Sequence, residues 1–183
     1  KDLLDPNSLF QGLTYSPPYF YLMSVLLPFS KWISPVVLMK SLSIVFDFLS
    51  AAGIFLIIRR KFPTGINKWV GFFAVCYAPT VVINSAYWGQ VDGVFTSFLV
   101  LSLFFILKQR TKLSLVLFAS ALAFKIQALI LSPVFLILLL RKKISLMETM
   151  IIPMVFFLWM VPAYFCGYPI LAPFTAIFNV AGE

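Results

Sequence analysis

Apolar residues run along the chain in long, nearly unbroken stretches that short basic clusters separate. The stretches cover residues 35–58, 69–86, 94–107, 113–140 and 149–165, and the clusters lie at residues 59–68, 108–112 and 141–143. A helix that crosses the hydrocarbon core of a bilayer needs about 20 predominantly apolar residues. The pattern therefore predicts an all-α, polytopic integral membrane protein whose helices are joined by basic loops.

Composition excludes a soluble fold. The 183 residues are 62% hydrophobic and 11% charged, with a mean hydropathy of +1.02, whereas soluble domains carry about 25% charged residues. The net charge of +8 comes mainly from the basic clusters, which flank the apolar stretches as the positive-inside rule describes. The clusters are therefore expected on the cytoplasmic side, and the charge indicates topology rather than a nucleic-acid partner.

The chain offers few metal ligands. It has no His and two Cys, which removes imidazole acid–base chemistry and the commonest metal ligand. Cys76 and Cys166 lie about one membrane crossing apart in the expected topology, so they are interpreted as packing residues rather than as a disulfide or a metal site. No metal and no cofactor are expected. The chain begins at Lys1 and ends at Glu183 without a terminal element, and we expect it to be a fragment of a longer protein.

Three regions follow from the lengths of the apolar stretches. Residues 1–34 are expected to form an extracytoplasmic loop, in which the apolar stretch 19–29 is too short to cross the bilayer and forms an interfacial helix. Residues 35–165 are expected to form the transmembrane bundle, with a kink at Pro79. Residues 166–183 are expected to form a second outer loop.

The stretch 113–140 has basic residues at both ends, so both ends should lie in the cytoplasm. Its 28 residues give about 42 Å of helix, which is short of the roughly 60 Å that two full crossings require. A hairpin of two short helices that meet near residues 125–127 reconciles length and charge. Broken helices at membrane depth occur where the backbone packs against protein or lines a cavity, which predicts that Lys125 faces a cavity.

Three ionisable residues fall within apolar stretches and are functional candidates for that reason. Lys40 and Asp47 are seven residues apart, too far for a direct ion pair on one helix. They either neutralise charges within the bundle or line a substrate site. Lys125 has no acidic residue on its own hairpin, so its counter-ion is either a carboxylate from another segment or the phosphate of a ligand.

Residues 88–93 (WGQVDG) combine groups that commonly bind sugars. Trp88 offers a ring for stacking, Gln90 an amide and Asp92 a carboxylate, and the flanking glycines let a ligand approach the backbone. The alternative is a tryptophan at the membrane interface followed by an ordinary turn. Tyr15, in the segment 15–19 (YSPPY), belongs either to the same site or to a rigid turn before the interfacial helix.

Four segments in this order resemble the GT-C fold glycosyltransferases, which are membrane enzymes that use polyprenyl-phosphate sugars. Residues 14–21 (TYSPPYFY) are similar to their Asp-Tyr-Pro-Pro segment, and Lys40 with Asp47 is similar to a basic-then-Asp pair. Residues 88–93 occupy the place of their polar outer loop, and residues 124–133 (FKIQALILSP) are similar to a Lys-x-Gln-x-Leu…Pro segment. The prokaryotic relatives of the GPI second mannosyltransferase and the glucosyltransferases of the endoplasmic reticulum look most similar.

The resemblance implies an inverting hexosyltransferase with a GT-C-like bundle. It would transfer mannose or glucose from a polyprenyl-phosphate donor to a lipid- or glycan-linked acceptor on the extracytoplasmic face. The membrane would be the prokaryotic plasma membrane or, in a eukaryote, that of the endoplasmic reticulum.

The resemblance also implies roles for individual residues. Lys125 and Gln127 would bind the donor phosphate. Trp88, Gln90, Tyr15, Lys40 and Asp47 would contact substrate. The usual catalytic Asp of the family lies upstream of the Tyr-Pro-Pro segment, and Thr14 stands where many relatives carry Asp. Among Asp2, Asp5 and Asp92 of this chain, Asp92 is the best-placed catalytic base.

Two other functions are compatible with the pattern. A transporter or lipid flippase also uses broken helices and intramembrane charges, although it has no particular need for polar motifs gathered on one face. A catalytically silent membrane subunit is the other alternative hypothesis.

Overall fold

The structure is a computed structural model that describes residues 16–167. These residues form helices and no β-strand. Three helical stretches are long and apolar enough to cross a membrane, namely Pro35–Lys61, Asn67–Tyr87 and Leu146–Phe165. The described part of the chain thus has the helices of an integral membrane protein, as the hydropathy pattern predicted. The apolar stretch before them forms the short helix α2 (Pro17–Leu26) and the 3₁₀ helix η1 (Leu27–Lys31).

Helix α3 (Pro35–Lys61) has clear start and stop signals. The Ser34 side chain accepts a hydrogen bond from the Val37 N–H at 3.4 Å, and Pro35 occupies the first helical position, where its missing N–H costs nothing. The helix ends on the basic cluster at residues 59–61, whose charges favour the carbonyl end of a helix.

The second stretch is interrupted where Pro79 was expected to kink it. Helix α4 (Asn67–Cys76) ends before the proline, α5 (Pro79–Val82) begins on it, and a π-helical turn, η2 (Ile83–Tyr87), follows. Proline lacks the N–H that would continue the hydrogen-bond ladder. The sequence gave no signal for the π-helical turn, which places one extra residue per turn just before the polar segment 88–91.

The next helices are too short to cross a bilayer. Helix α6 (Asp92–Leu107) is followed by α7 (Thr111–Phe124), and the chain then reverses at Lys125 into the 3₁₀ helix η3 (Ile126–Leu131) and α8 (Ser132–Leu140). The predicted break near residues 125–127 is confirmed by these bounds. Phe135 of α8 packs on Phe118 of α7 with ring centroids 4.5 Å apart, so the second arm returns beside the first.

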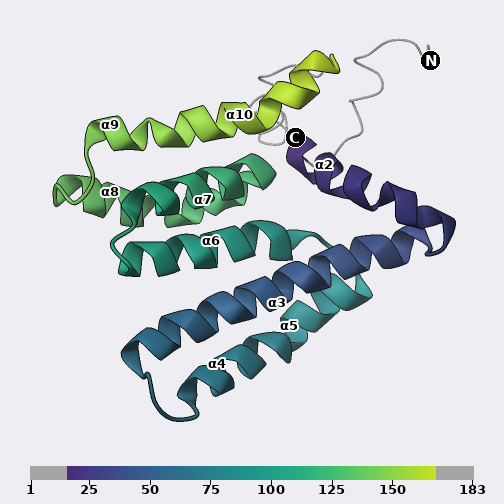
Figure 1. The fold of residues 1–183 in the computed structure, drawn as a ribbon, viewed down its shortest axis with the longest axis horizontal. Helices are drawn as coiled ribbons and strands as arrows, with labels where there is room; N and C mark the ends of the chain where they lie inside the picture. The colour runs from purple at the N-terminus through teal and green to yellow at the C-terminus, as the bar shows by residue number, and fades with distance from the viewer. Residues whose placement is uncertain (1–15, 168–183) are drawn as a thin grey trace, which may run out of the picture.

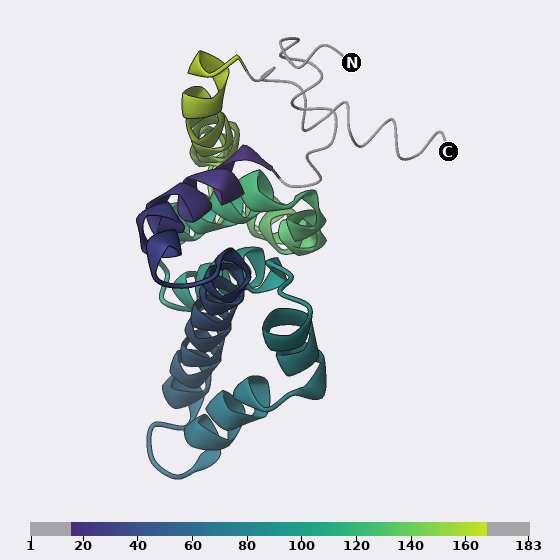
Figure 2. The same cartoon turned by 90° about the vertical axis from the view of Figure 1, so that its right-hand side faces the viewer.

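The helices form a row in which α4, α3, α6, α7 and α10 (Ile151–Phe165) are successive neighbours. Figure 1 shows this order from α4 at the bottom to α10 at the top, and Figure 2 shows the same row from the side on which α2 lies. A short helix, α9 (Leu146–Thr149), leads into α10. The ends that carry the basic clusters lie together on the left of Figure 1, and α2 lies at the opposite end.

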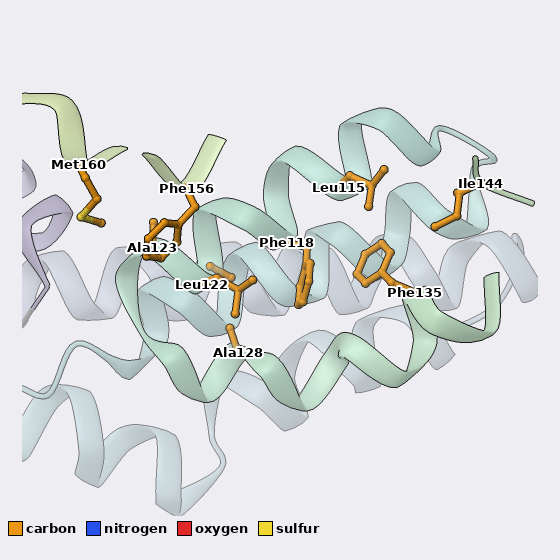
Figure 3. Close-up of a cluster of buried hydrophobic side chains, with 10 residues drawn as sticks. Leu115, Phe118, Leu122, Ala123, Ala128, Phe135, Ile144, Phe156 and Met160 are labelled. Atoms are coloured by element: carbon orange, nitrogen blue, oxygen red, sulfur yellow. The ribbon is translucent and has the colours of Figure 1, made fainter. Parts of the chain in front are cut away.

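The main apolar core joins α7, α8 and α10 (Figure 3). Alanines at positions 119, 121 and 123 are buried, and such small side chains allow helices in a membrane to approach closely. Ser102 of α6 and Ser114 of α7 are both fully buried, and each hydroxyl donates to the other residue's backbone carbonyl, at 2.8 and 2.9 Å. This reciprocal pair fixes α6 against α7.

Helices α6 and α7 are much shorter than α3. Counted from the basic end, the 16 residues of α6 rise about 24 Å and the 14 residues of α7 about 21 Å. The 27 residues of α3 rise about 40 Å. Because a hydrocarbon core is about 30 Å thick, α3 is long enough to cross it, whereas α6 and α7 are each too short.

Candidate functional site

An ion pair joins the far ends of the two short helices. Asp92 is the first residue of α6, and Lys125 follows the last residue of α7 in an extended conformation, with φ −155° and ψ 126°. The Lys125 Nζ donates a hydrogen bond to the Asp92 Oδ1. The two side chains are 33% and 32% exposed. The pair is therefore partly desolvated and still open to a ligand.

The pair lies in the wall of a cavity of about 330 Å³. The other residues around this cavity come from α2, the loop before α6, α6 itself and the reversal after α7. They are Tyr19, Gln90, Val91, Phe95, Phe124 and Gln127. We call these eight residues the polar cavity. It combines one carboxylate, one ammonium and two amides with aromatic walls.

Aromatic rings pack beside the cavity around the end of α7. The Lys125 Nζ lies 5.6 Å from the centroid of the Phe95 ring, within the range of a cation–π contact. Phe124 packs between Phe98 and Trp159, with centroid distances of 5.5 and 5.4 Å. The Trp159 indole donates to the Ser120 hydroxyl at 3.0 Å. These contacts fix the end of α7, and with it the position of Lys125.

Helix α2 covers one side of the polar cavity and is tied to two other helices. The Ser16 hydroxyl donates to the Ala123 carbonyl at 2.5 Å, which belongs to the last turn of α7, where the helix leaves its carbonyls unpaired. The Ala163 N–H of α10 donates to the Tyr21 hydroxyl at 2.9 Å. Burial raises the pKa of Tyr21 above its ordinary value, so this phenol stays neutral. Tyr19 is thereby held at the cavity wall.

The segment before Asp92 is held by its own backbone. The N–H groups of Trp88 and Gln90 donate to the carbonyls of Ile83 and Asn84 in η2, each at 2.9 Å. These bonds anchor the segment to the π-helical turn. The Gln90 side chain is thus carried on a fixed loop rather than on a free one.

Four of the residues singled out in the sequence meet at the polar cavity, namely Gln90, Asp92, Lys125 and Gln127. Lys125 was expected to need either a carboxylate from another segment or the phosphate of a ligand, and in the structure it pairs with the carboxylate of Asp92. The remaining candidates do not line this cavity. Trp88 is 66% exposed and is absent from its walls. Tyr15 lies outside the described residues.

Lys40 and Asp47 lie on α3. They pack against the segment 85–93, and neither lines the polar cavity. The stem of Lys40 packs against Gly89. Asp47 lines a separate, mainly apolar cavity of about 140 Å³ together with Ser85 and Cys76. The described residues contain no ion pair between Lys40 and Asp47, in agreement with their seven-residue spacing.

Sequence reasoning missed the aromatic part of the site. Phe95 and Phe124 are two of 21 phenylalanines in the chain, so composition gives them no distinction. Phe95 lies one helical turn after Asp92, and Phe124 directly precedes Lys125. Proximity to these two charges is the signal that was available for finding them.

The arrangement is suited to binding an anion beside a hydroxyl group. Lysine is a point charge that binds phosphate well, a carboxylate can accept a proton, and amides can bind the hydroxyls of a sugar. Within residues 16–167 no three His, Cys, Asp or Glu side chains gather in a metal-binding arrangement.

Comparisons of the chain with protein families, with curated proteins and with solved structures found no match.

Proposed function

We propose that the protein is an inverting membrane glycosyltransferase that transfers a hexose, mannose or glucose, from a polyprenyl-phosphate donor to an acceptor hydroxyl. The observation that carries this proposal is the Asp92–Lys125 pair in the wall of the polar cavity. The positive-inside rule assigns the opposite, basic end to the cytoplasm. The site then faces the extracytoplasmic side, which is where GT-C fold enzymes, the family that the sequence resembles, act.

Asp92 acts as the general base in this proposal. Its carboxylate takes the proton of the acceptor hydroxyl while the acceptor oxygen attacks the anomeric carbon. The bond between that carbon and the phosphate oxygen breaks, and the polyprenyl phosphate leaves with the bonding electron pair. A single displacement of this kind inverts the anomeric configuration. Asp92 is the one carboxylate among the residues of the polar cavity.

Lys125 stabilises the leaving phosphate. Charge develops on the phosphate oxygens as the glycosidic bond breaks, and a fixed cation in a partly desolvated site stabilises that charge strongly. Gln127 lies in η3, two residues after Lys125, and is available as a hydrogen-bond donor to the same group. Gln90 is available to the hydroxyls of the sugar.

The ion pair couples donor binding to activation of the base. Without a donor, Lys125 donates to Asp92, and the bond occupies one of the two carboxylate oxygens. A phosphate anion that binds Lys125 competes with Asp92 for the ammonium group. The carboxylate is then released when the donor is in place. Such coupling would keep Asp92 from accepting the acceptor proton until a donor is correctly bound.

The depth of the polar cavity supports a lipid-linked donor. The ends of α6 and α7 lie about 21–24 Å from the basic end of the bundle, so the cavity lies below the far surface of a core about 30 Å thick. A phosphate attached to an isoprenoid chain can reach this depth from within the bilayer. A water-soluble nucleotide sugar would have to leave the aqueous phase to do so.

Donor binding is the experiment that tests this proposal. The full-length protein is placed in nanodiscs and titrated with radiolabelled polyprenyl-phosphate mannose and, separately, glucose. We expect wild type to bind at least one of them and Lys125→Ala to bind at least tenfold more weakly, because the phosphate loses its cation. Lys112→Ala, which removes an exposed lysine at the basic end of α7, is the matched control and should bind as wild type does.

Failure of wild type to bind either donor would refute the assignment. A transporter or flippase is the second candidate, because a charge pair at a broken helix is also typical of a substrate pathway. It predicts that the donor crosses the membrane of a proteoliposome with its sugar still attached. A glycosyltransferase predicts release of free polyprenyl phosphate.

A further inference from the structure

One face of α3 contacts the loop that carries Gln90 and Asp92. Lys40, Ser43 and Asp47 follow one another at intervals of three and four residues, which puts them on the same side of a helix. Asp47 lies beside the beginning of the segment 85–93, Lys40 beside its middle, and Ser43 and Asp47 beside its end.

The beginning of the loop is held by Asp47. Ser85 in the π-helical turn η2 lies beside the Asp47 carboxylate, and both residues line the same small cavity. Ser85 is 1% exposed, and a buried hydroxyl needs a partner of this kind. The contact joins the end of the second membrane-spanning stretch to α3.

The end of the loop is held by the same carboxylate. A Cβ atom added to Gly93 would lie 2.5 Å from the Asp47 Oδ1 and 3.1 Å from the Ser43 carbonyl oxygen. The Ser43 oxygen cannot move far, since it belongs to the α3 backbone. Only glycine allows the first turn of α6 to approach α3 this closely. Gly93 directly follows Asp92, so this approach sets where α6 presents its first side chain.

The middle of the loop rests on Lys40. Gly89 has φ +73°, a left-handed conformation that favours glycine. A Cβ atom at Gly89 would lie 3.3 Å from the Lys40 Cγ. The methylene stem of Lys40 therefore packs under the turn that leads to Gln90.

We infer that Asp47 is a positioning residue for the polar cavity. It lies against both Ser85 and Gly93, and so fixes both ends of the segment 85–93 relative to α3. Lys40 supports the middle of that segment. Asp47 acts on the reaction through Asp92, whose carboxylate it holds opposite Lys125, and touches no substrate. The consequence for catalysis rests on the proposed function, whereas the consequence for the geometry of the loop does not.

Hydrogen exchange tests the geometric part without any substrate. The full-length protein in nanodiscs is compared with its Asp47→Ala, Asp47→Asn and Ser50→Ala variants by hydrogen–deuterium exchange and mass spectrometry. We expect Asp47→Ala to exchange at least tenfold faster in the segment 85–93 and unchanged elsewhere, and Asp47→Asn to restore most of the protection because its amide can still pack against Ser85. Ser50→Ala removes another buried polar group of α3 and should leave the segment unchanged.

Steady-state transfer tests the catalytic part. We expect Asp47→Ala to lower kcat by about 10- to 100-fold, the effect of misplacing a reacting group by roughly 1 Å, with the donor KM changed by about threefold or less since Lys125 stays in place. Asp47→Asn should recover most of kcat. A change in KM alone would assign Asp47 to substrate binding and overturn the inference.

The two measurements separate two kinds of failure. Unchanged exchange of the segment 85–93 in Asp47→Ala, or faster exchange throughout the bundle, would overturn the positioning role. Faster exchange confined to the segment in a protein whose wild type transfers no sugar would uphold the positioning role and refute the proposed function.

Discussion

At the residue scale, the account depends on two opposite charges brought together within an apolar bundle. Lys125 was recognisable in the sequence because an ionisable residue in an apolar stretch is costly, and Asp92 because it lies among the sugar-binding residue types of the segment 88–93. Their partnership was not predictable. Asp92 and Lys125 are 33 residues apart, and a protein carboxylate and a ligand phosphate satisfy a buried lysine equally well. The exposed position of Trp88 was also not predictable, since interfacial and sugar-stacking tryptophans have the same sequence signature.

A double-mutant cycle on this pair tests its contribution to stability. Lys125→Met leaves Asp92 without its partner, so we expect the free energy of unfolding to fall by about 1–2 kcal/mol, less than for a fully buried pair because both groups are partly exposed. The double variant Asp92→Asn with Lys125→Met should recover at least half of that loss. Thermal unfolding in one detergent measures all four proteins. Strictly additive losses would mean that the two side chains do not interact.

At the element scale, the short helices decide where the site lies. That α7 and α8 are short followed from the sequence, because the stretch 113–140 is too short for two crossings and yet carries basic residues at both ends. The break at Lys125 followed from the same argument. The π-helical turn at Ile83–Tyr87 did not, since nothing in its five residues distinguishes it from an ordinary helical turn. The packing of the serines that join α6 to α7 was not predictable either, because it depends on which helices are neighbours.

The serine pair between α6 and α7 supports a prediction about stability. Ser102→Ala removes one of the reciprocal hydrogen bonds, and we expect it to lower the free energy of unfolding by about 0.6 kcal/mol, the average for such bonds in a membrane. Ser102→Leu should cost about 1–3 kcal/mol, because Ser102 is fully buried and a larger side chain forces the helices apart. Chemical unfolding in mixed micelles measures both. Ser41→Ala, on the exposed side of α3, is the control, and an equal loss there would remove the special role of the pair.

At the scale of the whole molecule, the helix ends next to the basic clusters lie together at one end of the bundle (Figure 1), and the polar cavity is lined by residues at the opposite ends of α6 and α7. Charge patterning was sufficient to predict the two ends, since it reads topology directly. The row of helices from α4 to α10 was not predictable, because each apolar helix offers similar surface on several sides. That row is what brings residues 90–92 and 125–127 to one cavity. The same arrangement places Asp47 against the segment 85–93 and outside the polar cavity.

The central claim is that Asp92 accepts the proton of an acceptor while Lys125 binds the phosphate of a lipid-linked donor. Transfer and binding measured together on Asp92→Asn test it most directly, with the full-length protein in nanodiscs, labelled donor and an acceptor hydroxyl in excess. The account predicts that Asp92→Asn binds the donor at least as tightly as wild type, because Lys125 is released, and transfers sugar about 10²–10⁴-fold more slowly. Transfer at the wild-type rate by Asp92→Asn would contradict the account.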